Sequence, residues 1–164
     1  MRILGVDCGS KVTGYGVIEV RGPRCGLIDS GAIRPGSRDS LVRRLELIHE
    51  GLAGVIGRWS PDVAAFESVF HAANAQSALK LGHVRGVSMF AAAQARLPVY
   101  EYSALEVKSA VTGYGRAEKS QVQEMVRLLL DLKEAPEPYD ASDALAVAIC
   151  HAHSHRYRQA TATS

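Results

Sequence analysis

Apolar residues in the first part of the chain form short runs of strand length, separated by glycine and proline. Such runs between turn residues are typical of β-strands. They predict strands over residues 2–7, 14–20 and 25–33. The connections, Cys8-Gly9-Ser10 and Gly22-Pro23, are short. The three strands are therefore expected to form an antiparallel meander.

The pattern then changes to an apolar residue at every third or fourth position, which predicts an amphipathic helix after an N-cap at Asp39 or Ser40. Its apolar positions are Leu41, Leu45, Ile48, Leu52, Val55, Ile56 and Trp59. Ser60-Pro61 ends the helix, and a strand follows at about 62–67. If the helix is a crossover connection, this strand is parallel to the first one.

The second half of the chain predicts four more helices and a fifth strand. The helix from Asn74 to about Arg96 carries small residues that fit either packing on its own sheet or a subunit interface, namely Ala75, Ala78, Gly82, Gly86 and Ala93. The other elements are a strand at 98–101, a short helix near 104–110, a helix containing Val122, Met125, Val126, Leu129 and Leu130, and a largely apolar helix at about 140–155.

The chain has 164 residues, of which 47% are hydrophobic and 22% charged, which fits one globular domain over residues 1–155 with a flexible tail at 156–164. No apolar run approaches the roughly 20 residues of a membrane span, and no secretory signal precedes the first strand. Three cysteines fit neither a disulfide framework nor a zinc site. We expect a cytoplasmic protein. The net charge of +2 identifies no partner by itself.

Four acidic residues stand where this fold could bring them together. Asp7 and Glu67 end two strands expected to be parallel, and such strands end at the same edge of a sheet. Asp140 and Asp143 share one face at the start of the last helix. Taken singly, Asp140 is more simply a helix N-cap, Asp143 a partner of the helix dipole, and the other two strand termini.

Together the four acids favour a metal centre, because a divalent cation offsets the repulsion among buried carboxylates. Carboxylate oxygens are ligands of Mg²⁺ and Mn²⁺, and two such ions can drive attack of water on a phosphodiester. The sequence therefore predicts a nuclease with Asp7, Glu67, Asp140 and Asp143 as its metal-binding catalytic residues.

Basic and aromatic residues near these acids are candidate contacts for a polyanionic substrate. The basic candidates are Lys80, Arg85, Lys108, Arg116 and Lys119, each of which is by default a solubilising surface residue. Phe70 could stack on an unpaired base or lie in the core. His151, His153 and His155 lie too far along the last helix to join the acids and are expected at the surface, with adventitious metal binding as the alternative.

Several motifs along the chain are similar to those of one protein family. The first two strands contain Ile3-Leu4-Gly5-Val6-Asp7-Cys8-Gly9-Ser10 and Thr13-Gly14-Tyr15-Gly16-Val17-Ile18, which resemble the opening of the RuvC family of Holliday junction resolvases. The similarity spans about residues 2–155 and continues through Glu67-Ser68-Val69-Phe70, Ser77-Ala78-Leu79-Lys80-Leu81-Gly82, Arg85-Gly86, Val107-Lys108, Ala117-Glu118-Lys119-Ser120-Gln121-Val122 and Asp140-Ala141-Ser142-Asp143-Ala144-Leu145-Ala146.

The resemblance implies an α/β, RNase H-like fold of the retroviral integrase superfamily, with a five-stranded mixed sheet flanked by helices. It also implies a homodimer that uses Mg²⁺, replaceable by Mn²⁺ and two ions per site, to nick two strands of like polarity in a four-way DNA junction. RuvA and RuvB would be its partners. The family's catalytic acids fall on Asp7, Glu67, Asp140 and Asp143, its DNA-contacting lysines on Lys108 and Lys119, and its stacking aromatic on Phe70.

The sequence departs from the family pattern at two positions, with Cys8 in place of the common proline and Ser142 in place of the usual alanine. Cys8 beside the expected metal raises the hypothesis of oxidation sensitivity or of inhibition by soft metals. Two other functions stay open. One is a junction-binding protein that does not cut DNA. The other is an actin-like or sugar-kinase nucleotide-binding domain, because the segment Gly5-Val6-Asp7-Cys8-Gly9-Ser10 also resembles the first phosphate loop of those proteins.

Overall fold

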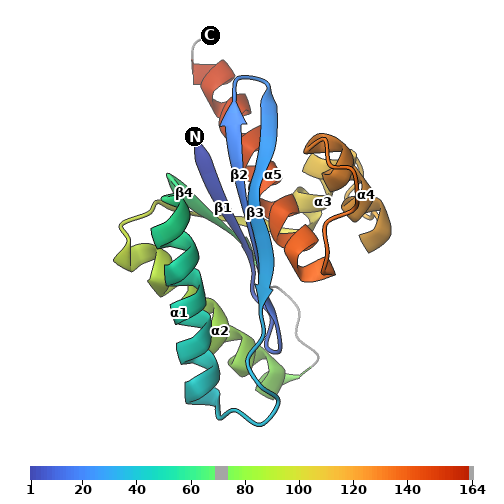
Figure 1. Ribbon diagram of the computed structural model, residues 1–164. Helices are drawn as coiled ribbons and strands as arrows, with labels where there is room; N and C mark the ends of the chain where they lie inside the picture. The colour runs from blue at the N-terminus through green and yellow to red at the C-terminus, as the bar shows by residue number, and fades with distance from the viewer. Residues whose placement is uncertain (69–73, 163–164) are drawn as a thin grey trace.

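The computed structural model describes residues 1–68 and 74–162 and contains one five-stranded sheet of order β3-β2-β1-β4-β5 (Figure 1). The strands are β1 (Arg2–Asp7), β2 (Thr13–Arg21), β3 (Arg24–Ile33), β4 (Val63–Ser68) and β5 (Val99–Ser103). Strands β1, β2 and β3 are antiparallel, and β4 is parallel to both β1 and β5. The predicted meander, the parallel fourth strand and the mixed five-stranded sheet are confirmed.

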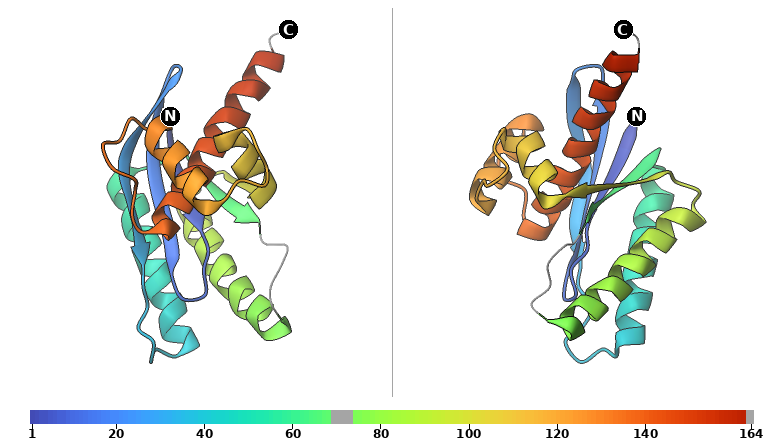
Figure 2. Two further views of the ribbon diagram at one scale, coloured as in Figure 1. Left: turned by 90° about the vertical axis from the view of Figure 1, so that its right-hand side faces the viewer. Right: turned by 180° about the vertical axis from the view of Figure 1, so that it is seen from behind.

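The helices cover the sheet from both sides (Figures 1 and 2). Helices α1 (Leu41–Trp59) and α2 (Ala75–Gln94) pack on one face. Helices α3 (Ala104–Thr112), α4 (Lys119–Leu129) and α5 (Tyr139–Ala162) lie on the other. Each helix occupies a segment that the sequence predicted as helical, so the RNase H-like arrangement of a mixed sheet flanked by helices is present.

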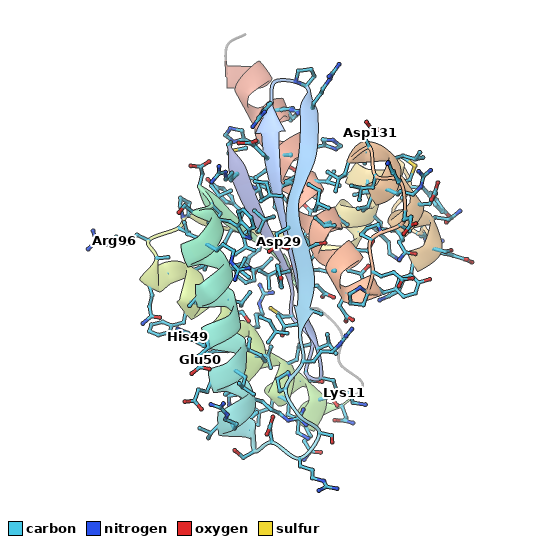
Figure 3. All side chains as sticks on the ribbon, in the orientation of Figure 1. Lys11, Asp29, His49, Glu50, Arg96 and Asp131 are labelled. Carbon is cyan, nitrogen blue, oxygen red and sulfur yellow. The ribbon has the colours of Figure 1, made fainter. Side chains whose placement is uncertain are left out.

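The ends of α1 are anchored by polar side chains. Ser40 is the N-cap, since its side chain accepts a hydrogen bond from the backbone N–H of Arg43. At the other end, Trp59 Nε1 donates to the Asp29 carboxylate of β3 at 2.8 Å; Asp29 is labelled between α1 and the sheet in Figure 3. These bonds hold α1 along the strands and so set the direction in which the chain enters β4.

Side chains of β1 alternate between two apolar cores, as they must along a strand. Ile3 packs in the core beneath α5, whereas Leu4, Val6 and Cys8 pack in the core beneath α1 and α2. Asp7 has the parity of Ile3, so its side chain leaves the sheet on the side of α5.

Helix α5 crosses β1 and β2 at very close range because glycines line its path. A Cβ built on Gly5 would lie 2.0 Å from the carbonyl oxygen of Ala144, and one built on Gly14 would lie 1.9 Å from that of Asp140. Any side chain at these positions would push the helix away. The glycines thus allow the first turn of α5 to approach the end of β1.

Helix α5 corrects two predictions. It begins at Tyr139, so Asp140 lies inside the first turn and is not the N-cap. It also continues to Ala162, beyond the predicted end near residue 155, and Arg156 donates to the carbonyl of Gly22 at 2.7 Å. Contacts between this helix and the β2–β3 turn could not be read from sequence. The flexibility of 156–164 and the domain boundary at residue 155 stay predictions.

The small residues of α2 that the sequence singled out do not pack on their own sheet. The buried positions of this helix are Val84, Ser88, Ala91 and Ala92. The exposed ones include the predicted packing residues Ala75, Ala78, Gly82, Gly86 and Ala93. A Cβ on Gly82 or Gly86 would meet nothing within 4 Å. Packing on the sheet is therefore the wrong interpretation for this stripe, and the interface interpretation stays a prediction. Within the described chain, no helix has the length and apolarity to span a membrane.

Candidate active site

Asp7 and Glu67 lie side by side at the carboxyl ends of two adjacent parallel strands. The register pairs Val6 with Phe66, which places the next residue of each strand at the same edge. Glu67 has the parity of Ala65, which packs in the core beneath α5. Both carboxylates therefore leave the sheet on the face that α5 covers. The sequence predicted their common edge, whereas the face comes from the structure.

Helix α5 brings Asp143 to the same place. Asp143 lines a cavity of about 160 Å³ together with Asp7 and Glu67. Its side chain is 18% exposed. Asp140, one turn earlier on α5, does not line this cavity but lies near enough to raise the pKa of Asp7 by charge repulsion. The structure thus gathers three of the four predicted acids around one cavity, with the fourth beside them.

The carboxylates disturb one another's protonation. Burial, followed by repulsion from Asp143 and Glu67, raises the pKa of Asp7 to about 7. Burial and then the charge of Asp143 raise the pKa of Glu67 as well. These acids carry more negative charge than the surrounding side chains neutralise. Perturbed carboxylates that face one cavity are typical of a functional site.

Two lysines provide positive charge at the cavity. Lys119, the first residue of α4, donates from Nζ to Asp143 Oδ2 at 2.8 Å, and this bond raises the pKa of the lysine. Lys108 of α3 also lines the cavity. The positive charges of Lys119 and Lys108 oppose the rise in the pKa of Glu67 that burial and Asp143 cause. Of the five basic residues predicted from sequence, these two are the ones that line the acidic cavity.

The donor set suits a hard divalent cation, since carboxylate oxygens are the ligands that Mg²⁺ and Mn²⁺ prefer. Asp7 is mostly buried and its pKa is raised by three other acids, a repulsion that a cation would relieve. Among the described residues, however, no three His, Cys, Asp or Glu side chains stand close enough together to form a finished metal site. Asp143 is paired with Lys119, and Asp140 lies beside Arg34. The acids fit the ion in the chemistry of their oxygen ligands and in their common location at or beside the cavity.

The remaining predicted DNA contacts lie apart from the cavity. Lys80 is exposed on α2 and lines another depression with Ser10 and Arg44. Arg116 is exposed in the α3–α4 connection. Arg85 is bonded to Glu67 and Glu101. Phe70 lies outside the residues that the structure describes.

Arg34 is a residue of the site that the sequence did not predict. It directly follows β3, and its guanidinium lies 4.0 Å from the Asp140 carboxylate. The register of the sheet explains its position: Gly14 pairs with Ala32 on β3 and contacts the backbone of Asp140. In the sequence, nothing separates Arg34 from other arginines in loops. The order of the strands in the sheet places it beside Asp140.

His151 corrects the prediction that all three histidines of α5 are at the surface. Its side chain is 1% exposed, its Nδ1 lies 2.8 Å from the hydroxyl of Tyr102, and its ring packs on that of Tyr100. His153 is half-buried, with Nδ1 3.0 Å from the carbonyl oxygen of Ala110. These contacts belong to the packing of α5 on β5 and α3.

Cys8 follows Asp7 in sequence, but its side chain lies in the core on the other face of the sheet. It is 6% exposed, and burial raises the pKa of its thiol to about 12. Because the thiolate is the form that oxidants attack, this environment disfavours the oxidation hypothesis.

The sequence is similar to one known protein family along most of its length. Residues 3–151 match the family described as "Crossover junction endodeoxyribonuclease RuvC". The protein of that name from Syntrophotalea carbinolica is 58% identical over 147 residues, which make up 90% of this chain and 91% of the relative. The one from Geobacter sulfurreducens is 55% identical over 147 residues, with 90% and 89% covered.

Solved structures agree with the sequence comparison. RuvC of Thermus thermophilus superimposes with a TM-score of 0.88 at 35% identity and 96% coverage of both chains. The same protein "in complex with Holliday junction substrate" gives a TM-score of 0.91 with the same identity and coverage. These matches confirm the predicted resemblance and the RNase H-like fold, and they do not favour the actin-like or sugar-kinase alternative. The chain is a member of the RuvC family of crossover junction endodeoxyribonucleases.

Proposed function

We propose that this protein is a Holliday junction resolvase that hydrolyses phosphodiesters in two strands of like polarity of a four-way DNA junction, in recombination and repair. The observation that carries the proposal is the cavity where Asp7, Glu67 and Asp143 meet Lys108 and Lys119. Such a cavity combines oxygen ligands for cations with positive charge for a phosphate. Membership of the RuvC family supports the choice of a junction as the substrate.

The cofactor in this proposal is Mg²⁺, with Mn²⁺ able to substitute and two ions per site. Asp7, Glu67, Asp140 and Asp143 would hold the ions as the metal-binding catalytic residues. A bound divalent cation supplies Lewis-acid activation of the attacking water and neutralises charge that develops on the phosphate. The raised pKa of Asp7 fits this assignment, because a carboxylate repelled by its neighbours gains most from a cation.

The lysines act on the substrate in our proposal. Lys119 stays charged through its bond to Asp143, and Lys108 approaches the cavity from α3. Positively charged side chains beside the reacting phosphate stabilise the negative charge of the transition state. They also attract the DNA backbone, which the carboxylates alone would repel. Lys80 and Arg116 are further contacts for the junction arms, since both are exposed. Phe70 keeps its proposed role of stacking on a base.

The protein acts as a homodimer in this proposal, with α2 at the interface. The exposed face of α2 carries large apolar side chains, with Leu79 63% and Phe90 56% exposed. Gly82 and Gly86 lie between them on the same helical face with nothing within 4 Å of their Cβ positions. An apolar stripe with small residues suits close approach of a second helix. A two-fold dimer would present two active sites, one for each nicked strand. RuvA and RuvB as partners in the cytoplasm complete the proposal, on family resemblance alone.

The decisive experiment incubates a synthetic mobile four-way junction with the protein in Mg²⁺, in Mn²⁺ and in EDTA, and maps the nicks on each strand. We expect paired nicks at symmetric positions with either cation and none in EDTA. Asp7→Asn should abolish nicking while junction binding persists. Binding without cleavage by the wild-type protein, across several junction sequences, would support the junction-binding alternative instead.

A further inference from the structure

Arg85 reaches from α2 to two strands at once. Its Nη1 donates to the backbone carbonyl oxygen of Glu67 on β4, and its Nη2 pairs with the carboxylate of Glu101 on β5. Only 17% of its side chain is exposed. A solubilising arginine keeps its guanidinium in water, whereas here both terminal nitrogens are used within the protein.

The hydrogen bond from Arg85 to Glu67 lies at the end of β4, where this strand is paired on one side only. Strand β1 pairs with β4 only as far as Phe66, whereas β5 continues to pair as far as Ser68. The last two residues of β4 thus have a strand neighbour on one side only. Glu101, the other partner of Arg85, is opposite Phe66 on the edge strand β5. The guanidinium therefore joins the unsupported end of β4 to β5.

The carbonyl and the carboxylate of Glu67 serve different purposes. The carboxylate lines the acidic cavity on the α5 face, whereas α2, which carries Arg85, packs on the opposite face. Arg85 is not among the residues that line the cavity. It touches the backbone that carries the catalytic acid and leaves the acid itself free.

We propose that Arg85 is a positioning residue: by holding the Glu67 carbonyl and bracing it on Glu101, it fixes the end of β4 so that the Glu67 carboxylate faces Asp7 and Asp143. This role replaces the DNA contact predicted from sequence, and it rests on the proposed function because it concerns the same metal site. Residues that orient a ligand through a neighbouring contact typically contribute about 10- to 100-fold to metal affinity.

The test compares Arg85→Ala and Arg85→Lys with the wild type and with Arg58→Ala, a control at an exposed arginine of α1 that has no part in the proposed site. Mn²⁺ binding to the free protein is measured by calorimetry, junction binding in EDTA is measured as a function of salt, and nicking is titrated with Mg²⁺. We expect Arg85→Ala to weaken Mn²⁺ binding, and to raise the Mg²⁺ concentration for half-maximal nicking, by about tenfold or more. The KM for the junction and its salt dependence should not change, and Arg85→Lys should recover part of the loss.

Two outcomes would overturn the role. Unchanged Mn²⁺ binding with weaker junction binding, and a salt slope smaller by about one phosphate, would identify a DNA contact. Unchanged values throughout would show that Arg85 does neither. If Arg85→Ala does not fold, Glu101→Ala gives the same test, since it removes the brace and should shift Mn²⁺ affinity in the same direction by less. Calorimetry needs no cleavage, so a wild-type protein that binds Mn²⁺ without nicking would count against the proposed function and still test Arg85.

Discussion

Gly14 of β2 lies directly beneath the backbone of Asp140, so close that a Cβ on the glycine would stand 1.9 Å from the Asp140 carbonyl oxygen. Gly14 is paired with Asp7 on β1. One glycine therefore connects the strand that carries the first acid with the helix turn that carries the third. The distance between these two elements is set by the absence of a side chain.

Replacement of Gly14 by alanine should lower both stability and nicking. The methyl group must displace helix backbone, and overpacking of this kind costs about 1–3 kcal/mol or more. Thermal unfolding and Mg²⁺-dependent nicking measure the two effects. Gly26→Ala is the matched control, because it is also a strand glycine but has nothing within 4 Å of its Cβ position. Equal melting temperatures for the two variants would contradict the close packing.

Asp7 should make stability fall as pH rises. The pKa of Asp7 is about 7 in the folded protein, against 3.8 for an aspartate in water, so between these pH values the folded state holds a proton that the unfolded state releases. In EDTA, Asp7→Asn should therefore be more stable than the wild type above pH 7, by up to about 4 kcal/mol, with little difference near pH 4. Chemical unfolding at both pH values measures this gap. A gap of the same size at both would refute the assigned protonation.

Divalent cations should restore part of the stability that the folded protein loses when Asp7 ionises. An ion that binds the folded state alone stabilises it by mass action. At pH 8, Mg²⁺ or Mn²⁺ should raise the melting temperature of the wild-type protein and have a much smaller effect on Asp7→Asn. Equal stabilisation of both proteins would place the bound cation elsewhere.

Lys119→Ala should reduce nicking strongly with little effect on folding. The pair with Asp143 is formed by a lysine side chain that is 70% exposed, and such pairs contribute at most about 1 kcal/mol to stability. Loss of a cation at the reacting phosphate costs far more in rate, of the order of 100-fold. Single-turnover nicking measures the rate, and Lys133→Ala, at an exposed position after α4, is the control. Nicking that stays within twofold of the wild-type rate would remove Lys119 from the site.

Ser142→Ala should stabilise the protein. Ser142 is 1% exposed, and its hydroxyl oxygen has no hydrogen-bond partner among the described residues. A buried hydroxyl without a partner costs about 1–3 kcal/mol, and alanine removes it while leaving a similar shape. Denaturant unfolding should show a higher midpoint with an unchanged slope. A lower midpoint would mean that the hydroxyl has a partner.

Phe90→Asp should dissociate the proposed homodimer. A charge at position 90, on the exposed apolar face of α2, would be buried by a second subunit, which is unfavourable. Light scattering on the variant should give the mass of one chain, and Leu128→Asp on α4, 53% exposed in the wild type, should leave the dimer intact. A monomeric wild-type protein would contradict the proposed interface.

The alternation of apolar residues, the turns and the helix periods determined most of the architecture from sequence alone. They predicted the five strands, and a crossover helix between the first and fourth strands implied that Asp7 and Glu67 end at one edge. This works because strand and helix periods are local properties, and because a crossover connection leaves few orders for the strands. The identity of the acids followed from their places at the ends of those elements.

Tertiary structure decided what depends on lateral packing. Three features join segments that lie apart in the sequence: the position of Arg34 beside Asp140, the hydrogen bond from Arg85 to the backbone carbonyl of Glu67, and the burial of His151 against Tyr102. No local sequence pattern predicts such contacts, because an arginine or a histidine looks the same in the sequence whether its side chain is exposed in a loop or packed between helices and strands. Acidic residues at strand ends reveal a site, but the side chains that orient it become visible only when the helices are docked on the sheet.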